Sequence, residues 1–170
     1  RLVADCSTAR VLDAGCADGW LLDALSPRAG FGCDICRYEG FPSRWEFRED
    51  DVRNLSYQDE CFDVAVASLL LMWFPELDRA LRELRRVTRP NGCVVIAIMN
   101  PYFYRTGQAC DAGDFVIERD LSRPFVIRNH RIAGTVGPFA YYYRPLPTYL
   151  NECIRAGLTI EEVADWHVDM

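Results

Sequence analysis

The sequence VLDAGCADG at residues 11–19 decides the fold. The apolar run Arg10 to Ala14 predicts a short buried strand, and the small residues from Gly15 to Gly19 predict a tight turn. Trp20 to Leu25 then opens a helix, which Pro27 helps to stop. Small residues between a strand and a helix let the backbone approach a ligand at the helix N-terminus. The segment therefore predicts the first strand–turn–helix unit of a ligand-binding α/β fold.

The same alternation continues up to residue 99. A poor helix over residues 37–44, interrupted by Gly40 and Pro42, is expected to make one turn at most. A better helix follows Pro75, with its apolar residues at helical spacing, and the Pro90-Asn91-Gly92 turn comes after it. Alternating strands and helices with short turns predict a mostly parallel sheet flanked by helices. The further strands are expected at residues 29–35, 45–50, 62–67 and 93–99.

After Asn100 the pattern changes. Residues 102–143 are rich in aromatic side chains, with β-type runs at 115–117 and 125–127. A helix over residues 147–156 follows, capped by Gly157, and a last strand is expected at 158–163. We interpret residues 1–170 as a single domain, in which an insertion at roughly 101–145 forms an aromatic-rich cap after the fifth strand.

Composition narrows the class of protein. Half of the residues are hydrophobic and the net charge is −6, which disfavours nucleic acid and anionic membrane as partners. No apolar run approaches the roughly 20 residues of a membrane span, and the first ten residues lack a signal sequence. We therefore expect a cytoplasmic chain with reduced thiols. The lone pair Cys33 and Cys36 lacks the further ligands of a zinc site, so no metal is expected.

The turn at residues 15–19 does not suit a dinucleotide. A nicotinamide dinucleotide site is typically GxGxxG, with free amides for the pyrophosphate. Here the spacing is Gly-x-Ala-x-Gly, and Asp13 and Asp18 flank or occupy the turn. Two carboxylates repel a pyrophosphate but favour a ligand that carries an ammonium and a sulfonium. S-adenosylmethionine (SAM) has both groups.

Two further acidic positions follow neighbouring strands. Asp34 ends the second strand, where a carboxylate can accept hydrogen bonds from both ribose hydroxyls. Asp51 and Val52 follow the third strand, where a carboxylate and an amide can read an adenine edge. Singly, each has an ordinary alternative: a tight turn, a helix cap or a solvated side chain. Their order at the carboxyl ends of successive strands favours one shared crevice.

At this point the sequence resembles class I SAM-dependent methyltransferases, in particular the family called methyltransferase domain 11. Residues 11–19 are similar to its first motif, V-L-D-x-G-C-G-x-G, and residues 51–55 to its adenine segment. Residues 62–68 resemble its fourth strand, and residues 86–92 the turn before its fifth strand. Residues 143–158 are similar to a C-terminal helix of small-molecule members. The resemblance implies a Rossmann-like fold.

The resemblance also implies the cofactor SAM, the product S-adenosylhomocysteine (SAH) and a set of contacts. The methionine part would be held by Asp13, Gly15, Cys16, Ala17 and Gly19. The ribose would be held by Asp34 and Ile35, the adenine by Asp51 and Val52, and the amino-acid end by the backbone of Ser68 and Leu69. Ala17 departs from the usual glycine, and its methyl group is costly if φ is positive there.

The aromatic insertion favours a small-molecule acceptor, which would receive the methyl group on oxygen or nitrogen. The sequence singles out no catalytic base. The tyrosines of the insertion and the Trp73-Phe74 pair are expected to form an acceptor wall or to lie in the core, and His130 and His167 are more typical of surface positions. Two alternatives stay open: a degenerate, non-catalytic SAM-binding domain that acts through protein partners, and an RNA or protein methyltransferase.

Overall fold

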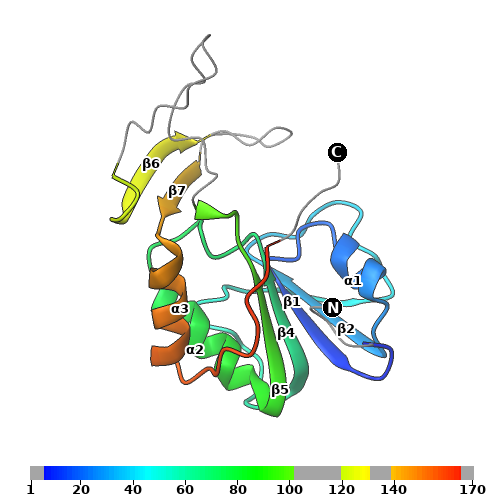
Figure 1. The fold of residues 1–170 in the computed structure, drawn as a ribbon. Helices are drawn as coiled ribbons and strands as arrows, with labels where there is room; N and C mark the ends of the chain where they lie inside the picture. The colour runs from blue at the N-terminus through cyan, green and yellow to red at the C-terminus, as the bar shows by residue number, and fades with distance from the viewer. Residues whose placement is uncertain (1–5, 102–119, 131–138, 166–170) are drawn as a thin grey trace.

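The computed structural model describes residues 6–101, 120–130 and 139–165 (Figure 1). Its centre is a five-stranded sheet in the order β3-β2-β1-β4-β5, and all four neighbouring pairs are parallel. The strands are β1 (Arg10–Ala14), β2 (Ala29–Asp34), β3 (Glu46–Glu49), β4 (Phe62–Ser68) and β5 (Thr88–Ala97). The predicted Rossmann-like α/β fold is confirmed.

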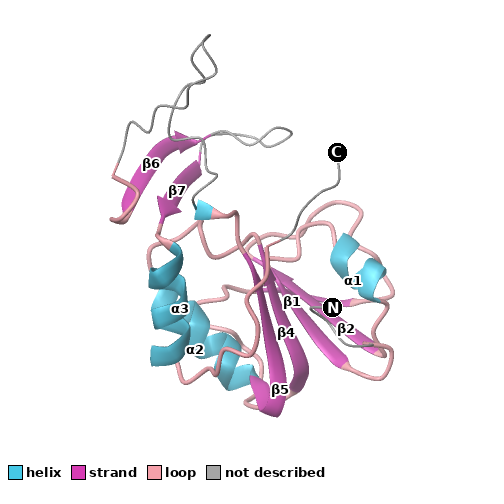
Figure 2. Ribbon diagram, viewed as in Figure 1, coloured by secondary structure: helices cyan, strands magenta, loops and turns pink. Residues whose placement is uncertain are grey.

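Helices cover both faces of this sheet (Figure 2). Helix α1 (Trp20–Leu25) buries Leu22 on one face, in a cluster with Val11 and Val66. Helix α2 (Leu77–Val87) packs on the other face, and its five buried side chains recur every three or four residues, as the sequence predicts. Helix α3 (Leu146–Arg155) lies beside α2. None of the described helices is long and apolar enough to cross a membrane.

Strand β5 begins five residues earlier than expected. Thr88 pairs with Phe62 directly after α2, and a shift of register separates this pair from Val64 and Cys93. The Pro90-Asn91-Gly92 segment is therefore a bulge within the strand rather than a turn before it. Asn91 has a positive φ of 62°, and a side chain at Gly92 would collide with Thr88 and with the Asp63 carbonyl. The bulge thus needs its Asn-Gly pair.

A two-stranded antiparallel hairpin follows the sheet in sequence. Its strands are β6 (Phe125–His130), which confirms the β-type run at 125–127, and β7 (Phe139–Tyr143), which the sequence analysis did not predict. The hairpin lies beyond the N-terminal end of α3, apart from the main sheet (Figure 1). The expected run at 115–117 lies outside the described residues.

The expected helix at 147–156 is confirmed as α3, and Gly157 ends it. Gly157 has φ +81°, and the amides of Gly157 and Leu158 donate to the carbonyls of Ile154 and Cys153, a Schellman motif. The strand expected at 158–163 is wrong. Among the described residues, β5 pairs only with β4, and residues 159–163 are exposed in an irregular segment. Alternating polarity alone does not make a strand where no partner supplies the ladder.

Candidate cofactor site

Most backbone amides of the loop at residues 15–19 donate hydrogen bonds within the protein. The N–H groups of Gly15 and Cys16 both donate to the Cys33 carbonyl, at 2.8 and 3.1 Å, and the Gly19 N–H donates to the Cys16 carbonyl at 2.8 Å. The Ala17 N–H donates to Asp34 Oδ2 at 3.1 Å. Four of the five loop amides therefore have partners inside the protein. A pyrophosphate needs such amides free, so the loop is not built for one.

The conformation of the loop depends on glycine at two points. Gly15 and Gly19 have φ of +73° and +79°, in the left-handed region that favours glycine. A Cβ at Gly15 would lie 2.7 Å from Leu70 Cδ1, and one at Gly19 would lie 2.9 Å from Phe41. The buried Phe41 comes from residues 35–45, which form turns and no helix, as the poor helical pattern indicates. Phe41 thus packs closely against the loop at Gly19.

Three carboxylates gather around this loop. Asp13 is only 2% exposed, and burial, reinforced by the charges of Asp34 and Asp18, raises its pKa to about 7. Across the described parts of the chain, no ion pair involves any of these three side chains. The region around the loop is therefore acidic and lacks a counterion among the described residues. It suits a cationic ligand.

Asp34 lies at the end of β2, as expected. Its Oδ1 accepts from the Ile35 N–H at 2.8 Å and its Oδ2 from the Ala17 N–H. Each carboxylate oxygen can accept a second hydrogen bond, so both remain able to bind a ribose hydroxyl. The neighbouring Ile35 is 71% exposed and offers an apolar surface at the same strand end. These two residues fit a nucleoside.

Asp51 is bound by Arg53, a residue that the sequence analysis did not consider. The Arg53 guanidinium binds it through two nitrogens, Nε to Oδ1 at 2.9 Å and Nη2 to Oδ2 at 2.6 Å, and holds the pKa of Asp51 below its usual range. Arg53 also contacts Glu76, which immediately precedes α2. Val52 is buried. The sequence analysis missed Arg53, although its place two residues after the acid is visible in the sequence.

Leu69 turns the chain after β4. It has φ +52°, its N–H donates to the Ala97 carbonyl at 2.8 Å, and its carbonyl accepts from Trp73 Nε1 at 2.7 Å. The amide of Leu69 is thus used within the sheet, whereas its carbonyl oxygen keeps one acceptor position, which suits an ammonium. Ser68 precedes it at the end of β4.

Ala17 stands in a left-handed conformation, with φ +46°. This is the condition under which its methyl group is costly, by about 1 kcal/mol relative to an ordinary backbone conformation. Residue 17 therefore has the left-handed backbone conformation that favours glycine, although it is an alanine.

On the hairpin side, two of the candidate tyrosines are structural. Tyr141 and Tyr143 are 2% and 1% exposed, and the Tyr143 hydroxyl donates to the Leu121 carbonyl at 3.1 Å. Trp73 contacts the edge of Tyr141, with ring centroids 5.7 Å apart. His130 closes β6, but only its backbone is described. Tyr102, Tyr104 and His167 lie outside the described residues.

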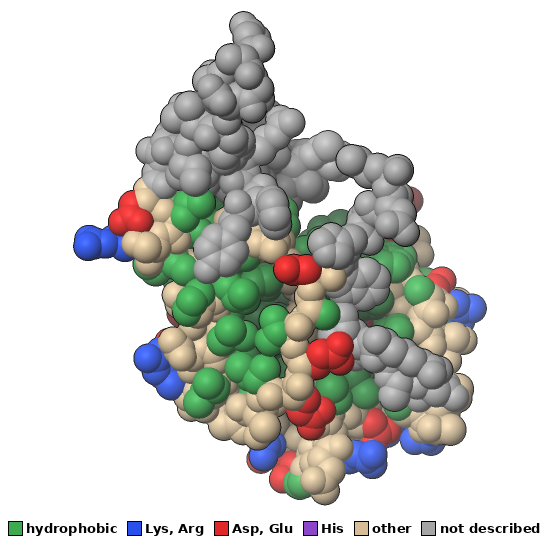
Figure 3. All heavy atoms as spheres, in the orientation of Figure 1, with side chains coloured by type: hydrophobic (Ala, Val, Ile, Leu, Met, Phe, Trp, Pro, Cys, Tyr) green, Lys and Arg blue, Asp and Glu red, His purple; other side chains and the backbone are tan. Residues whose placement is uncertain are grey.

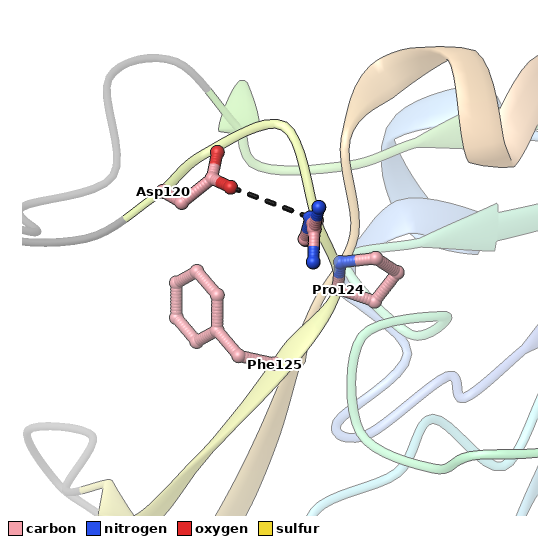
Figure 4. A pocket seen from close by; sticks show the side chains of 4 residues that line it. Asp120, Pro124 and Phe125 are labelled. Atoms are coloured by element: carbon pink, nitrogen blue, oxygen red, sulfur yellow. Dashed lines mark ion pairs between the residues drawn. The ribbon is translucent and has the colours of Figure 1, made fainter.

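Two hollows lie elsewhere. One is at the start of the hairpin, lined by Asp120, Arg123, Pro124 and Phe125, with the Asp120–Arg123 ion pair across it (Figure 4). The other lies at the opposite end of the sheet from Asp34, around Arg10. No predicted cofactor residue lines either hollow. No group of three or more metal-ligating side chains occurs among the described residues, which include Cys33 and Cys36.

The parallel α/β sheet with carboxylates at the ends of β1 and β2 is the fold and site expected of a SAM-dependent methyltransferase, and sequence comparison gives the family. Residues 12–96, half of the chain, match the family described as methyltransferase domain. The chain belongs to this family, as the resemblance in the first motif predicts, and SAM is the cofactor of its class.

Individual proteins and solved structures that are similar to this chain are also methyltransferases. A malonyl-[acyl-carrier protein] O-methyltransferase of Pectobacterium atrosepticum is 32% identical over 97 residues, which cover 53% of this chain and 38% of that protein. The chain thus matches less than half the length of such relatives. A SAM-dependent methyltransferase structure from Mesorhizobium loti has a TM-score of 0.80 at 21% identity, covering 97% of this chain and 81% of that one. One from Listeria monocytogenes has a TM-score of 0.73 at 16% identity, covering 91% and 79%. These structures share the fold.

Proposed function

We propose that this chain binds SAM at the carboxyl ends of β1, β2, β3 and β4 and transfers its methyl group to a small-molecule oxygen or nitrogen. The observation that carries the proposal is the loop at residues 15–19. Its amides are hydrogen-bonded within the protein, and Asp13, Asp18 and Asp34 surround it without a cation among the described residues. Such a site repels phosphates and attracts a nucleoside that carries a sulfonium and an ammonium.

The contacts follow the strand ends. Asp13, Gly15, Cys16, Ala17 and Gly19 would hold the methionine part, supported by the exposed acceptor position of the Leu69 carbonyl beside Ser68. Asp34 and Ile35 would hold the ribose. Asp51 and Val52 would meet the adenine, with the Asp51 carboxylate kept ionised and oriented by Arg53.

Methyl transfer from SAM needs little contribution from ionisable side chains. In an in-line displacement the acceptor atom forms a bond to the methyl carbon while the carbon–sulfur bond breaks, and the sulfur keeps the electron pair as a neutral thioether. The protein supplies proximity, alignment and exclusion of water. If the acceptor carries a proton, it leaves to a base or to water. As the positive charge of the sulfonium is lost, its attraction to the acidic crevice falls, which favours release of the product.

A small acceptor is supported by the aromatic hairpin. Phe139 of β7 is in edge-to-face contact with Trp73, which lies in the turn after the carboxyl end of β4, and the buried Tyr141 supports Trp73 through a second edge-to-face contact. Apolar and aromatic walls of this kind suit small organic acceptors. The Pectobacterium relative is named for a carboxylate acceptor on a carrier protein, so a malonyl thioester belongs among the acceptors to test.

The direct test is methyl transfer from methyl-labelled SAM to a panel of phenols, carboxylic acids, amines and malonyl thioesters. We expect one acceptor class to gain label in proportion to the SAH formed, and Asp34→Asn to lower the rate. SAM binding without label in any acceptor would favour the non-catalytic alternative. Labelling of RNA or protein alone would overturn the assignment of a small acceptor.

A further inference from the structure

Arg144 is a buried cation that bonds to backbone carbonyls instead of a carboxylate. It follows β7 directly, and only 8% of it is exposed. Its Nη1 donates to the carbonyls of Leu71 and Tyr142, at 3.1 and 3.4 Å, and its Nη2 to those of Phe74 and Pro75, at 2.6 and 3.0 Å. Within the described residues it has no ion pair. A buried guanidinium is tolerated when its donors are satisfied, and here four hydrogen bonds to carbonyls engage both Nη atoms.

The aromatic rings around Arg144 hold it further. Its guanidinium lies 5.6 Å from the centroid of the Tyr142 ring and 5.9 Å from that of Tyr149, which belongs to α3. Arg144 thus joins three parts of the chain: the hairpin, α3 and the turn at residues 69–75 that follows β4. We call residues 69–75 the β4 turn.

Arg144 binds the β4 turn at several of its carbonyls at once. Arg144 donates to the carbonyls of Leu71 and Phe74, and the Pro75 carbonyl accepts both from Arg144 and from the Leu77 N–H. A fork-shaped guanidinium can reach both ends of the turn at once, which a shorter, single-headed ammonium does less well. Loss of Arg144 would remove a donor from these two buried carbonyls, and the resulting cost favours a shift of the turn.

The β4 turn touches both halves of the proposed site. On the cofactor side, Leu70 packs against Gly15, so closely that a Cβ there would lie 2.7 Å away. On the acceptor side, the Tyr142 N–H donates to the Met72 carbonyl at 2.8 Å, and the Trp73 ring packs on Tyr141. A shift of this turn moves the acceptor wall relative to the cofactor loop.

We infer that Arg144 is a positioning residue: it fixes the β4 turn so that the acceptor wall, which includes Trp73, faces the methyl donor at the correct distance. The inference rests on the proposed function for its catalytic consequence. Its structural part stands on the hydrogen bonds alone. Because Arg144 binds carbonyls of the turn and not the residues proposed for the nucleoside, its loss should act on the acceptor more than on SAM.

The variants are Arg144→Met, which keeps the length and removes the donors, and Arg144→Lys, which keeps the charge and part of the bonding. Arg155→Met is the matched control, since Arg155 lies at the end of α3, is exposed and pairs only with Glu152. We expect Arg144→Met to lower kcat/KM for the acceptor at least 30-fold, with the Kd for SAH changed less than threefold. Arg144→Lys should lie between, and Arg155→Met should match the wild type.

A second measurement is independent of turnover. Hydrogen exchange followed by mass spectrometry should show faster exchange in peptides covering residues 69–77 and 139–145 of Arg144→Lys, with exchange in residues 10–34 unchanged. Unchanged exchange in the β4 turn, or equal losses of SAH affinity and acceptor kcat/KM, would overturn the inference. If the wild type methylates no acceptor, the proposed function fails, and the exchange pattern alone decides whether Arg144 holds the turn.

Discussion

The Asp34 carboxylate accepts a hydrogen bond from the Ala17 N–H at 3.1 Å, which ties the end of β2 to the loop after β1. The bond places a carboxylate under the loop, where a phosphate-binding fold would leave the amide free. It also brings the Asp34 charge close enough to raise the pKa of Asp13. The same two residues thus shape the loop and set its electrostatic preference for a cation.

The first prediction concerns Asp34. Asp34→Asn keeps an oxygen that can accept from Ala17 but removes the charge and one acceptor for the ribose. We expect SAM affinity to fall roughly 10- to 100-fold, the range for loss of a charged hydrogen bond. Isothermal titration measures it, and thermal unfolding checks that the fold persists. Asp78→Asn, an exposed position paired with Arg82 on α2, is the control and should bind as the wild type does.

The second prediction concerns pH. The Asp13 carboxyl is largely protonated below its raised pKa of about 7, and a cationic ligand favours the ionised form. SAM affinity should therefore rise with pH up to about 7 and then level off, with proton release on binding. Titrations in buffers of different ionisation enthalpy measure this release. In Asp13→Asn the rise should be absent, and a pH dependence that survived in this variant would contradict the assignment.

Asp13 also links pH to stability. An unfolded aspartate titrates near 4, so between pH about 4 and about 7 the folded chain binds more protons than the unfolded chain. The contribution of Asp13 to the free energy of unfolding therefore falls as pH rises through this window. Denaturant titrations at several pH values should show a smaller fall for Asp13→Asn than for the wild type. An equal fall in both would assign the linkage to other groups.

The third prediction concerns Ala17. Because its φ is +46°, Ala17→Gly relieves a left-handed strain of about 1 kcal/mol, partly offset by the greater freedom of glycine in the unfolded chain. We expect the variant to be as stable as the wild type or slightly more stable. Ala24→Gly in α1, an exposed helical position, should instead lose up to about 1 kcal/mol. Equal losses at both positions would contradict the strained backbone at Ala17.

The fourth prediction concerns the thiols. Burial raises the pKa of Cys16 to about 12 and also raises that of Cys33, so neither forms a thiolate near neutral pH. Iodoacetamide should label the exposed Cys36 in the native protein and leave Cys16 and Cys33 unlabelled until the chain unfolds. Peptide mapping by mass spectrometry measures the order. Cys36→Ser together with Cys33→Ala should leave SAM binding intact, whereas loss of a stoichiometric metal would contradict the absence of a metal site.

The sequence predicts the sheet well because its strands are short, apolar and separated by recognisable turns. Periodicity predicted α2, and the strand-end acids Asp13 and Asp34 lie close enough for their charges to interact. Strand 158–163 was predicted wrongly because pattern carries no information about a pairing partner. The aromatic residues from Phe139 to Tyr143 favour a strand, and this signal for β7 was not used in the sequence analysis.

The role of Arg144 could not be predicted, because its partners are backbone carbonyls some 70 positions away in the sequence. Every residue has a backbone carbonyl, so the sequence does not show which carbonyls accept a side-chain hydrogen bond. The sequence analysis did not predict the positive φ of Ala17, because an alanine favours a negative φ. It stated only that a positive φ there would be costly. Whether the inserted region belongs to the same folding unit as the rest of the chain stays a prediction.

We propose that the acidic ends of β1 and β2 bind SAM and exclude dinucleotides, and isothermal titration of the chain with SAM, SAH and NAD tests this proposal. We expect one site per chain for SAM and for SAH, both weakened by Asp34→Asn, and no binding of NAD. Binding of NAD, or SAM affinity that Asp34→Asn leaves unchanged, would contradict it.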